Sequence, residues 1–283
     1  MAQLAAAQDI VNQRQMHGKV VLISGAAGGL GAALCQRYAC AGSRIAAMDV
    51  DVARLDALVA DLKQRGAQAL ALPGNITDPA ICEAAVALTI SHFGTLDGLI
   101  NNAGISQRSL LRSTRIEVIR QVMEVNFFGA VHLTHAALPY ITARRGFIAA
   151  ISSVAGFSPL IGRTGYAASK HALHGFFDTL RSEVEDLGVS VTLICPSFIR
   201  TGIGAAGLGG DGSKASSARL ITGGESSALD IAERIFAAIA ESRHLLLPDR
   251  TSRLAWWLSR LAPQRYASIM KRRVGAEFDD APG

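Results

Sequence analysis

The chain has 283 residues, of which 49% are hydrophobic and 18% are charged. This size and apolar content are enough to bury a substantial core, as one large α/β domain or two small ones. The net charge of +5 is modest and lies partly near the C-terminus, so it argues against nucleic acid as a partner.

We find no sequence signal for a metal site or for targeting to a membrane or out of the cell. The cysteines Cys35, Cys40, Cys82 and Cys195 have neither a C-x-x-C spacing nor a metal-ligand pattern. We therefore expect reduced, mostly buried thiols, no metal site and a cytoplasmic location. The N-terminus does not read as a signal peptide, and no apolar run of about 18 residues predicts a transmembrane helix.

The first elements form a strand, a glycine-rich turn and a helix. Residues 1–17 predict a loose helix or a disordered tail, and the apolar run 19–23 predicts a buried strand. A helical pattern then extends to about Cys40. In such a unit the glycines let the backbone approach a pyrophosphate, which the helix N-terminus attracts. The turn residues that we expect at a dinucleotide are Gly25, Ala27, Gly28, Gly29, Leu30 and Gly31.

The second predicted strand, 44–48, ends at Asp49, 18 residues after Gly31. A carboxylate at this place accepts hydrogen bonds from the adenosine ribose of NAD and repels the 2′-phosphate of NADP. The alternative is that Asp49, like Asp51 nearby, caps the following helix. We favour the cofactor interpretation, so NAD is expected and NADP is the alternative.

The remaining pattern alternates between helices and strands. Such alternation predicts a parallel sheet with helices on both faces and ligands at the carboxyl ends of the strands. Gly25, Asp49, Asn102, Ser153 and Pro196 all fall at or just after predicted strand ends. The predicted helices cover 52–65, 79–93, 113–140, 163–187 and 228–241, and the further strands cover 67–72, 96–100, 146–152, 189–195 and 244–247.

Tyr166 and Lys170 are four residues apart and, within a helix, lie on one face. An ammonium near a phenol lowers the phenol pKa from about 10, so the pair can exchange a proton in the physiological range. Ser153, at the end of an apolar run, could hold the oxygen of a carbonyl or alcohol. Taken alone, the spacing also fits an ordinary Tyr/Lys pair on a helix surface.

Over roughly residues 17–250 the chain resembles the short-chain dehydrogenase/reductase family in its short single-domain form. The resemblance implies a doubly wound parallel sheet, the Rossmann fold, over 18–250, with an N-terminal tail (1–17) and a C-terminal extension (251–283). The residues that carry it are Ser24, Gly25, Gly29, Gly31, Asn101 to Gly104, Asn126, Ser153, Tyr166, Lys170, Pro196 and Thr201.

The resemblance also implies catalytic roles. Tyr166 would be the general acid and base, and Lys170 would lower its pKa and bind the nicotinamide ribose. Ser153 would orient the substrate oxygen. Asn126 would hold a water that links Lys170 to solvent, although an asparagine that merely bonds to the backbone is the alternative.

Further residues are implied to bind the cofactor. Asn102 and Gly104 would line its adenine-ribose side, and Thr201 would contact the carboxamide. Three positions depart from the family pattern: Ser24 replaces Thr, Asn75 replaces the Asp that contacts adenine, and Ser197 replaces Gly. The other implied cofactor contacts are Ile76, Ala103, Pro196, Ser197 and Ile199.

Two segments are not explained by this pattern. Residues 202–227 are rich in Gly, Ala and Ser, and a loop of this length is usually a functional lid or disordered. Residues 250–261 interleave Leu and Trp with Arg, so they could form a basic helix on a membrane surface. We favour packing of its apolar face on the body, a sister subunit or the substrate cleft. Residues 279–283 are expected to be disordered.

The leading hypothesis is an NAD-dependent oxidoreductase that interconverts a secondary alcohol and a ketone. Its partner would be a lipophilic small-molecule substrate, and the resemblance implies a homodimer or homotetramer built on helices 113–140 and 163–187. The alternatives are a 3-ketoacyl thioester reductase that uses NADPH and a non-catalytic dinucleotide-binding protein. The Asp49 interpretation counts against the reductase.

Overall fold

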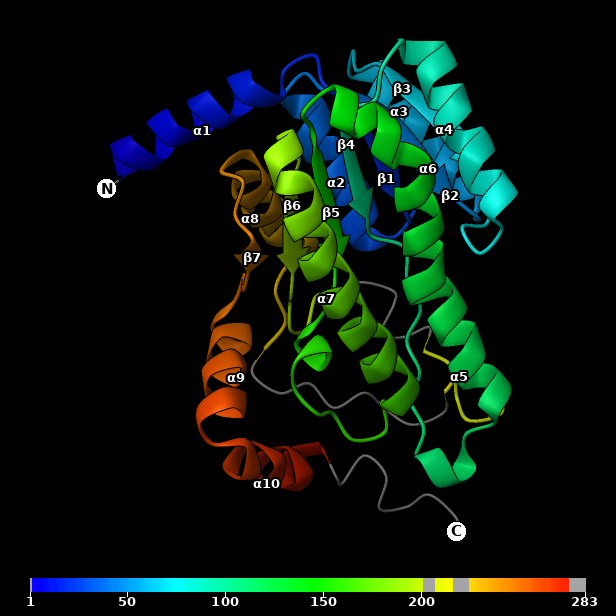
Figure 1. The fold of residues 1–283 in the computed structure, drawn as a ribbon, viewed down its shortest axis with the longest axis vertical. Helices are drawn as coiled ribbons and strands as arrows, with labels where there is room; N and C mark the ends of the chain where they lie inside the picture. Colours follow the sequence, from blue (N-terminus) through cyan, green and yellow to red (C-terminus); the bar gives the residue numbers. More distant parts are fainter. Residues whose placement is uncertain (1, 201–206, 216–223, 275–283) are drawn as a thin grey trace.

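The structure is a computed structural model that describes residues 2–200, 207–215 and 224–274. Its strands form one parallel sheet in the order β3-β2-β1-β4-β5-β6-β7 (Figure 1). Because the strand order reverses direction at β1, the sheet is doubly wound, as predicted. The strands are β1 (Val20–Ser24), β2 (Arg44–Asp49), β3 (Ala69–Pro73), β4 (Gly98–Asn101), β5 (Phe147–Ile151), β6 (Ser190–Ile194) and β7 (Leu245–Leu246).

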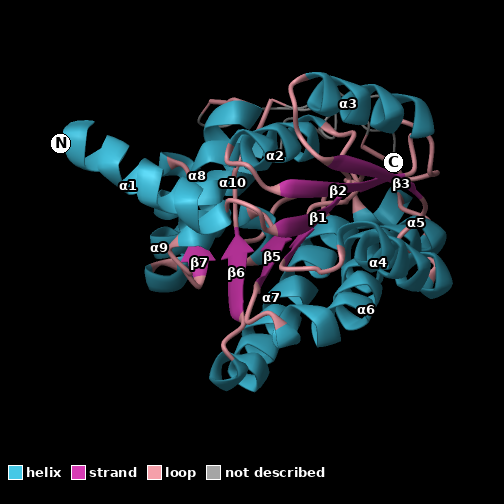
Figure 2. Ribbon diagram, turned by 90° about the horizontal axis from the view of Figure 1, so that it is seen from above, coloured by secondary structure: helices cyan, strands magenta, loops and turns pink. Residues whose placement is uncertain are grey.

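Helices cover both faces of the sheet, as the view from above shows (Figure 2). Side chains alternate between these faces along each strand. In β1, Val21 and Ile23 join one apolar core under α2, α3 and α8, whereas Val20 and Leu22 join the other core under α4, α6 and α7. The helices are α1 (Ala2–Met16), α2 (Gly29–Cys40), α3 (Val52–Gln64), α4 (Pro79–Phe93), α5 (Ile116–Met123), α6 (Gly129–Ala143), α7 (Thr164–Val184), α8 (Ala228–Ala240), α9 (Arg250–Leu261) and α10 (Pro263–Val274).

The helical region expected over 113–140 is divided into two helices. A π-helical turn, Glu124–Phe128, separates α5 from α6. A π turn inserts one extra residue into the helical repeat, and such turns are frequent at functional sites. Here it holds Asn126, whose side chain is buried. The sequence pattern contained no signal for this interruption.

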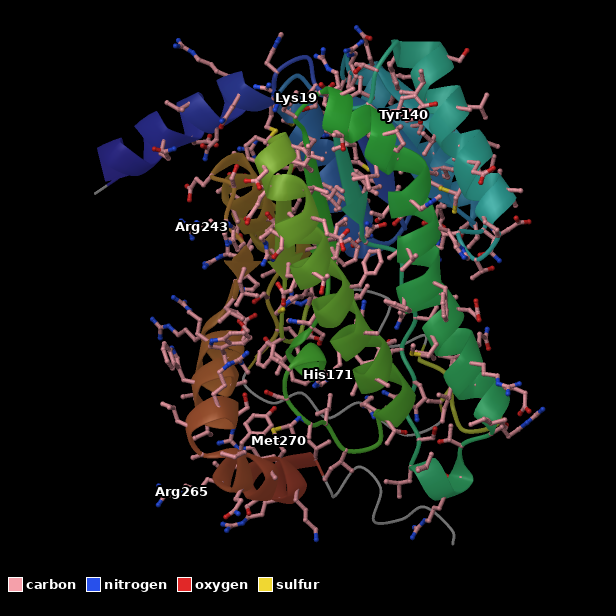
Figure 3. All side chains as sticks on the ribbon, viewed as in Figure 1. Lys19, Tyr140, His171, Arg243, Arg265 and Met270 are labelled. Atoms are coloured by element: carbon pink, nitrogen blue, oxygen red, sulfur yellow. The ribbon has the colours of Figure 1, made fainter. Side chains whose placement is uncertain are left out.

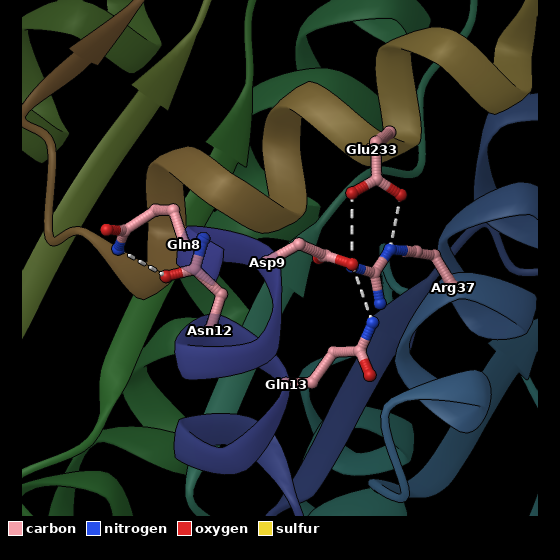
Figure 4. Close-up of polar contacts among 6 residues, drawn as sticks. All are labelled: Gln8, Asp9, Asn12, Gln13, Arg37 and Glu233. Carbon is pink, nitrogen blue, oxygen red and sulfur yellow. Dashed lines mark hydrogen bonds and ion pairs between the residues drawn. The ribbon is translucent and has the colours of Figure 1, made fainter. Parts of the chain in front are cut away.

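The N-terminal segment is a helix that is joined to the body of the protein by polar contacts (Figure 4). The Asp9 carboxylate on α1 lies 2.6 Å from the guanidinium of Arg37 on α2. The same guanidinium donates to Glu233 on α8, with 3.0 Å between Nη2 and Oε1. The segment was expected to be either a loose helix or a disordered tail, and it is a helix in the structure.

The carboxyl ends of the strands all lie at one end of the molecule. In Figure 3, Lys19 and Tyr140 mark the opposite end, whereas His171 and Met270 lie at the carboxyl end. The helices α9 and α10 also lie at the carboxyl end, beyond β7 (Figure 1). None of the described helices is both long enough and apolar enough to cross a membrane.

Candidate active site

Five predicted residues form a row at the carboxyl edge of the sheet. Asp49, Gly25, Asn102, Ser153 and Pro196 end or closely follow β2, β1, β4, β5 and β6, which are neighbours in this order. The sheet thus brings together residues that lie up to 171 positions apart in the sequence. The convergence inferred from predicted strand ends is confirmed.

The glycine-rich turn approaches the end of β4 so closely that side chains are excluded. Gly25 has a φ of +64°, and a Cβ on it would lie 2.7 Å from the Cα of Ala103. A Cβ on Gly31 would lie 2.0 Å from the carbonyl oxygen of Gly25. Only glycine fits these places, and Gly31 already belongs to the first turn of α2, which begins at Gly29. The first amide groups of α2 lack partners within the helix, so they can bind an anion.

Asn102 supports this turn with its side chain. Its Nδ2 donates to the carbonyl oxygens of Ser24 and Gly25, at 2.9 and 3.0 Å. The Ser24 hydroxyl accepts hydrogen bonds from the amides of Asn102 and Ala103, both at 3.1 Å. A serine at position 24 therefore retains the hydroxyl that this contact needs. The cofactor contact expected of Asn102 stays a prediction, with its amide group engaged in holding the turn.

Asp49 is joined to the glycine-rich turn and does not cap a helix. Its carboxylate accepts hydrogen bonds from the amides of Ala27 and Asp51, both at 2.9 Å. Asp51 is the residue that caps α3, by accepting from Arg54. A carboxylate has about four acceptor sites, so Asp49 can still accept from ribose hydroxyls.

The adenine-side residues Asn75 and Ile76 follow β3. Asn75 is exposed, and its Oδ1 accepts from the amide of Thr77 at 3.1 Å. Ile76 is buried, and a Cβ on Gly129 would lie 2.5 Å from its Cδ1. The segment is thus fixed beside α6, and its contact with adenine stays a prediction.

Lys170 is buried on α7 beside Tyr166. Its Nζ lies 5.7 Å from the centroid of the Tyr166 ring and donates to the carbonyl oxygen of Ile151 at 2.8 Å. Burial lowers the pKa of the Lys170 ammonium from 10.5 to about 8, because desolvation penalises the charged form. The ammonium therefore still carries its charge at neutral pH, next to the phenol.

Asn126 connects the π-helical turn to this pair. Its Oδ1 accepts from the amide of Ile105 at 2.7 Å, and its Nδ2 donates to the Ile105 carbonyl and the Ser169 hydroxyl, both at 2.9 Å. A Cβ on Gly104 would lie 3.1 Å from Asn126 Oδ1 and 3.5 Å from Lys170 Nζ. The side chain is thus bonded to backbone, as the alternative interpretation had it, and the water-holding role stays a prediction.

Ser153 follows β5 and holds the start of a short 3-10 helix. Its hydroxyl oxygen accepts from the amide of Ala155 at 3.2 Å and caps a short 3-10 helix, Val154–Gly156. The role expected of this hydroxyl, to orient a substrate oxygen, stays a prediction. The preceding residue, Ser152, donates to the Lys170 carbonyl at 3.2 Å and so joins β5 to α7.

Asp249 is a residue of this region that the sequence reasoning missed. Its carboxylate accepts from the amide and the hydroxyl of Ser197, at 3.0 and 2.8 Å, and from the amide of Ser252 at 2.7 Å. It therefore caps α9 and fixes the segment after β6 at the same time. The only signal was an Asp followed by a Ser three residues later, which is a helix-capping pattern.

The other predicted residues after β6 have different outcomes. Pro196 is buried, and Ile199 forms an isolated parallel bridge with Ser226. Ser197, the departure from the family pattern, bonds to Asp249 through a hydroxyl that glycine lacks. Thr201 lies outside the described residues, as does half of the expected loop 202–227, namely residues 202–206 and 216–223.

We predict a pH-dependent difference in stability between the wild type and Lys170→Met. Below pH 8 both folded and unfolded wild-type chains hold the lysine proton, and the folded chain bears the full cost of the buried charge. Between pH 8 and 10.5 the unfolded chain holds more protons, so the wild type gains at most about 1.4 kcal/mol per pH unit relative to the variant. Urea unfolding across this range measures the free energy of unfolding of both proteins, and the wild-type value minus the variant value should rise with pH. A difference that stays constant from about pH 8 to 10.5 would contradict a depressed lysine pKa.

Comparisons with known proteins identify the family. A family model described as short chain dehydrogenase matches residues 19–207. The chain is 38% identical over 270 residues to the dehydrogenase/reductase SDR family protein 7-like of Anopheles gambiae, covering 93% of this chain and 85% of that protein. It is 35% identical over 276 residues to dehydrogenase/reductase SDR family member 7B of Mus musculus, covering 95% and 85%.

A solved structure shares the fold over nearly the whole chain. It is a short-chain dehydrogenase/reductase from Burkholderia phymatum in complex with NAD. The TM-score is 0.79 at 26% sequence identity, and the match covers 89% of this chain and 96% of the other. On the family model, the relatives and the fold, the chain belongs to the short-chain dehydrogenase/reductase family.

Proposed function

We propose that this oxidoreductase interconverts a secondary alcohol and a ketone with NAD as its cofactor. The observation that carries the proposal is the grouping of Ser153, Tyr166 and Lys170 beside the glycine-rich turn at one edge of the sheet. A hydroxyl donor, a phenol and a buried ammonium are the groups that proton transfer at a carbonyl or alcohol oxygen requires.

The residues present fit a nicotinamide dinucleotide. Gly25 before α2 and Gly31 in its first turn leave no room for side chains, and the N-terminus of α2 suits a pyrophosphate. Asp49 would hold the adenosine ribose, and Lys170 the nicotinamide ribose. The Burkholderia phymatum structure, which is in complex with NAD, supports this cofactor. When bound, the nicotinamide accepts or supplies the hydride.

The side chains of the protein would orient the substrate and move its proton. In oxidation Tyr166 takes the hydroxyl proton of the alcohol, and in reduction it returns a proton to the carbonyl oxygen. Ser153 would donate a hydrogen bond to the same oxygen while its own oxygen accepts from the Ala155 amide. The Lys170 charge favours the ionised phenol, because an opposite charge stabilises a nearby phenolate.

An apolar wall beside Ser153 supports a lipophilic substrate. Phe157 follows the 3-10 helix that Ser153 caps, and its ring makes an edge contact with Trp256 of α9, with 4.9 Å between centroids. An aromatic surface close to Ser153 favours a substrate with an apolar body and one reactive oxygen.

Tyr166→Phe tests the reaction. The variant keeps the ring but lacks the proton-transferring hydroxyl, so kcat/KM should fall by about 100-fold or more, in line with general acid–base catalysis. The measurement is the rate of NADH formation with a panel of lipophilic secondary alcohols. Tyr140→Phe is the matched control, because Tyr140 is 42% exposed at the opposite end of the molecule (Figure 3). Equal rates in wild type and Tyr166→Phe would contradict the proposal.

Asp49→Asn tests the preference for NAD. The change keeps one acceptor oxygen but removes the charge that repels a 2′-phosphate, so the NADP-to-NAD ratio of kcat/KM should rise by roughly tenfold. The control is Asp51→Asn, which neutralises a carboxylate two residues away. A wild-type enzyme that already prefers NADP would instead favour the ketoacyl reductase alternative.

Asp249→Ala tests whether the segment after β6 needs its link to α9. The change removes the acceptor for both groups of Ser197, so we expect KM for the dinucleotide to rise while kcat changes less. The lost hydrogen bonds should also cost about 1–3 kcal/mol of stability. Ser252→Ala weakens the same helix cap but leaves the Ser197 contacts in place. If both variants raise KM equally, the effect comes from α9 stability alone.

A further inference from the structure

The helix α9 carries an apolar stripe on its outer surface. Leu254, Trp257 and Leu261 are 66%, 61% and 77% exposed, and their spacing of three and four residues puts them on one face. The opposite face is covered by the body, where Ser252 and Ala255 are buried. We expected the apolar face of this helix to pack on the body. One face of α9 does so, but the stripe of Leu254, Trp257 and Leu261 is exposed. Exposed apolar side chains in a contiguous group mark an interaction surface.

The stripe lies within a strongly basic segment. Residues 250–274 contain seven Lys and Arg and no Asp or Glu, although the whole chain has a net charge of only +5. Residues 1–249 are close to neutral, with 21 Lys and Arg against 20 Asp and Glu, and Glu277, Asp279 and Asp280 follow the basic segment. Arg250, Arg253 and Arg260 on α9 are exposed, and Arg265 on α10 points away from the body in Figure 3. Residues 271–273 add three more exposed basic side chains at the end of α10.

We propose that α9 and α10 dock on the surface of an anionic phospholipid bilayer. The stripe of Leu254, Trp257 and Leu261 would enter the boundary between headgroups and acyl chains, where tryptophan is favoured. The basic side chains of both helices would lie near the lipid phosphates, since each Lys or Arg close to an anionic leaflet adds to binding.

The charge distribution favours an anionic bilayer over a second copy of the chain as the partner of this surface. A two-fold symmetric contact brings the same patch of each copy together. The stripe of α9 would then bring Arg250, Arg253 and Arg260 near their own copies, and residues 250–274 contain no acidic residue to balance them. An anionic bilayer offers both the opposite charge and an apolar layer for the stripe. The bilayer contact does not depend on the proposed reaction.

The docked surface would lie beside the candidate active site. Trp256, next to the stripe, contacts Phe157 after Ser153, and Asp249 at the start of α9 holds Ser197. A lipophilic substrate dissolved in the bilayer would therefore reach the candidate active site over a short path. This consequence, unlike the docking itself, rests on the proposed function.

The test is co-flotation of the full chain with phosphatidylcholine vesicles made with and without phosphatidylserine. We expect binding to the anionic vesicles that weakens with added salt, and little binding to the neutral ones. Trp257→Gln combined with Leu261→Gln should weaken binding by about tenfold or more, because the buried apolar area is lost. The triple change Lys271→Gln, Arg272→Gln and Arg273→Gln should weaken it to a similar degree.

The control is Leu88→Gln, which removes a side chain 57% exposed on α4 at the other side of the molecule and should bind as the wild type does. Thermal melts of every variant exclude unfolding as the cause of a loss. Equal flotation with both vesicle types, or unchanged binding of the Trp257→Gln/Leu261→Gln variant, would overturn the proposal. So would light scattering that shows a dimer in the wild type and a monomer in that variant, because the stripe would then join two copies.

Discussion

The buried ammonium of Lys170 is the constraint to which the rest of the candidate site is fitted. A charge taken out of water is costly unless its donors find partners. The fold supplies the Ile151 carbonyl as an acceptor for Nζ. The cost is not fully compensated, because burial still lowers the pKa of the lysine to about 8. The charge is nevertheless retained at neutral pH, where it can act on Tyr166.

The side chains around this lysine are held by contacts between separate elements. Ser152 joins β5 to the backbone of α7, and Asn126 joins the π-helical turn to Ser169 and Ile105. Each of these polar groups bonds to protein, so their positions are fixed before a ligand enters. Groups that need not rearrange during the reaction stabilise developing charge at a lower cost. The interruption between α5 and α6 belongs to this arrangement, since it holds Asn126.

The sequence was informative wherever function requires a residue type at the end of a strand. Strand positions followed from short apolar runs, and Asp49 and Ser153 followed from their places after those runs. The π-helical turn was not predictable, because its local pattern is that of an ordinary helix. The Asp249–Ser197 contact was not predictable either, because nothing in the chain marks a pair 52 residues apart as neighbours. Periodicity likewise cannot tell which apolar face of α9 the body covers, and the structure separates Trp256 from Trp257.

The start of α9 couples the outer surface of the protein to the candidate active site. One carboxylate, that of Asp249, accepts from Ser252 within α9 and from Ser197 after β6. A shift of α9 must therefore either move Ser197 or break bonds to a partly buried carboxylate, which costs more than a neutral contact. Glycine at position 197 would lack the hydroxyl half of this link. Ser197 thus links the segment beside the expected nicotinamide site to α9. The outer face of α9 is exposed and carries both apolar and basic side chains.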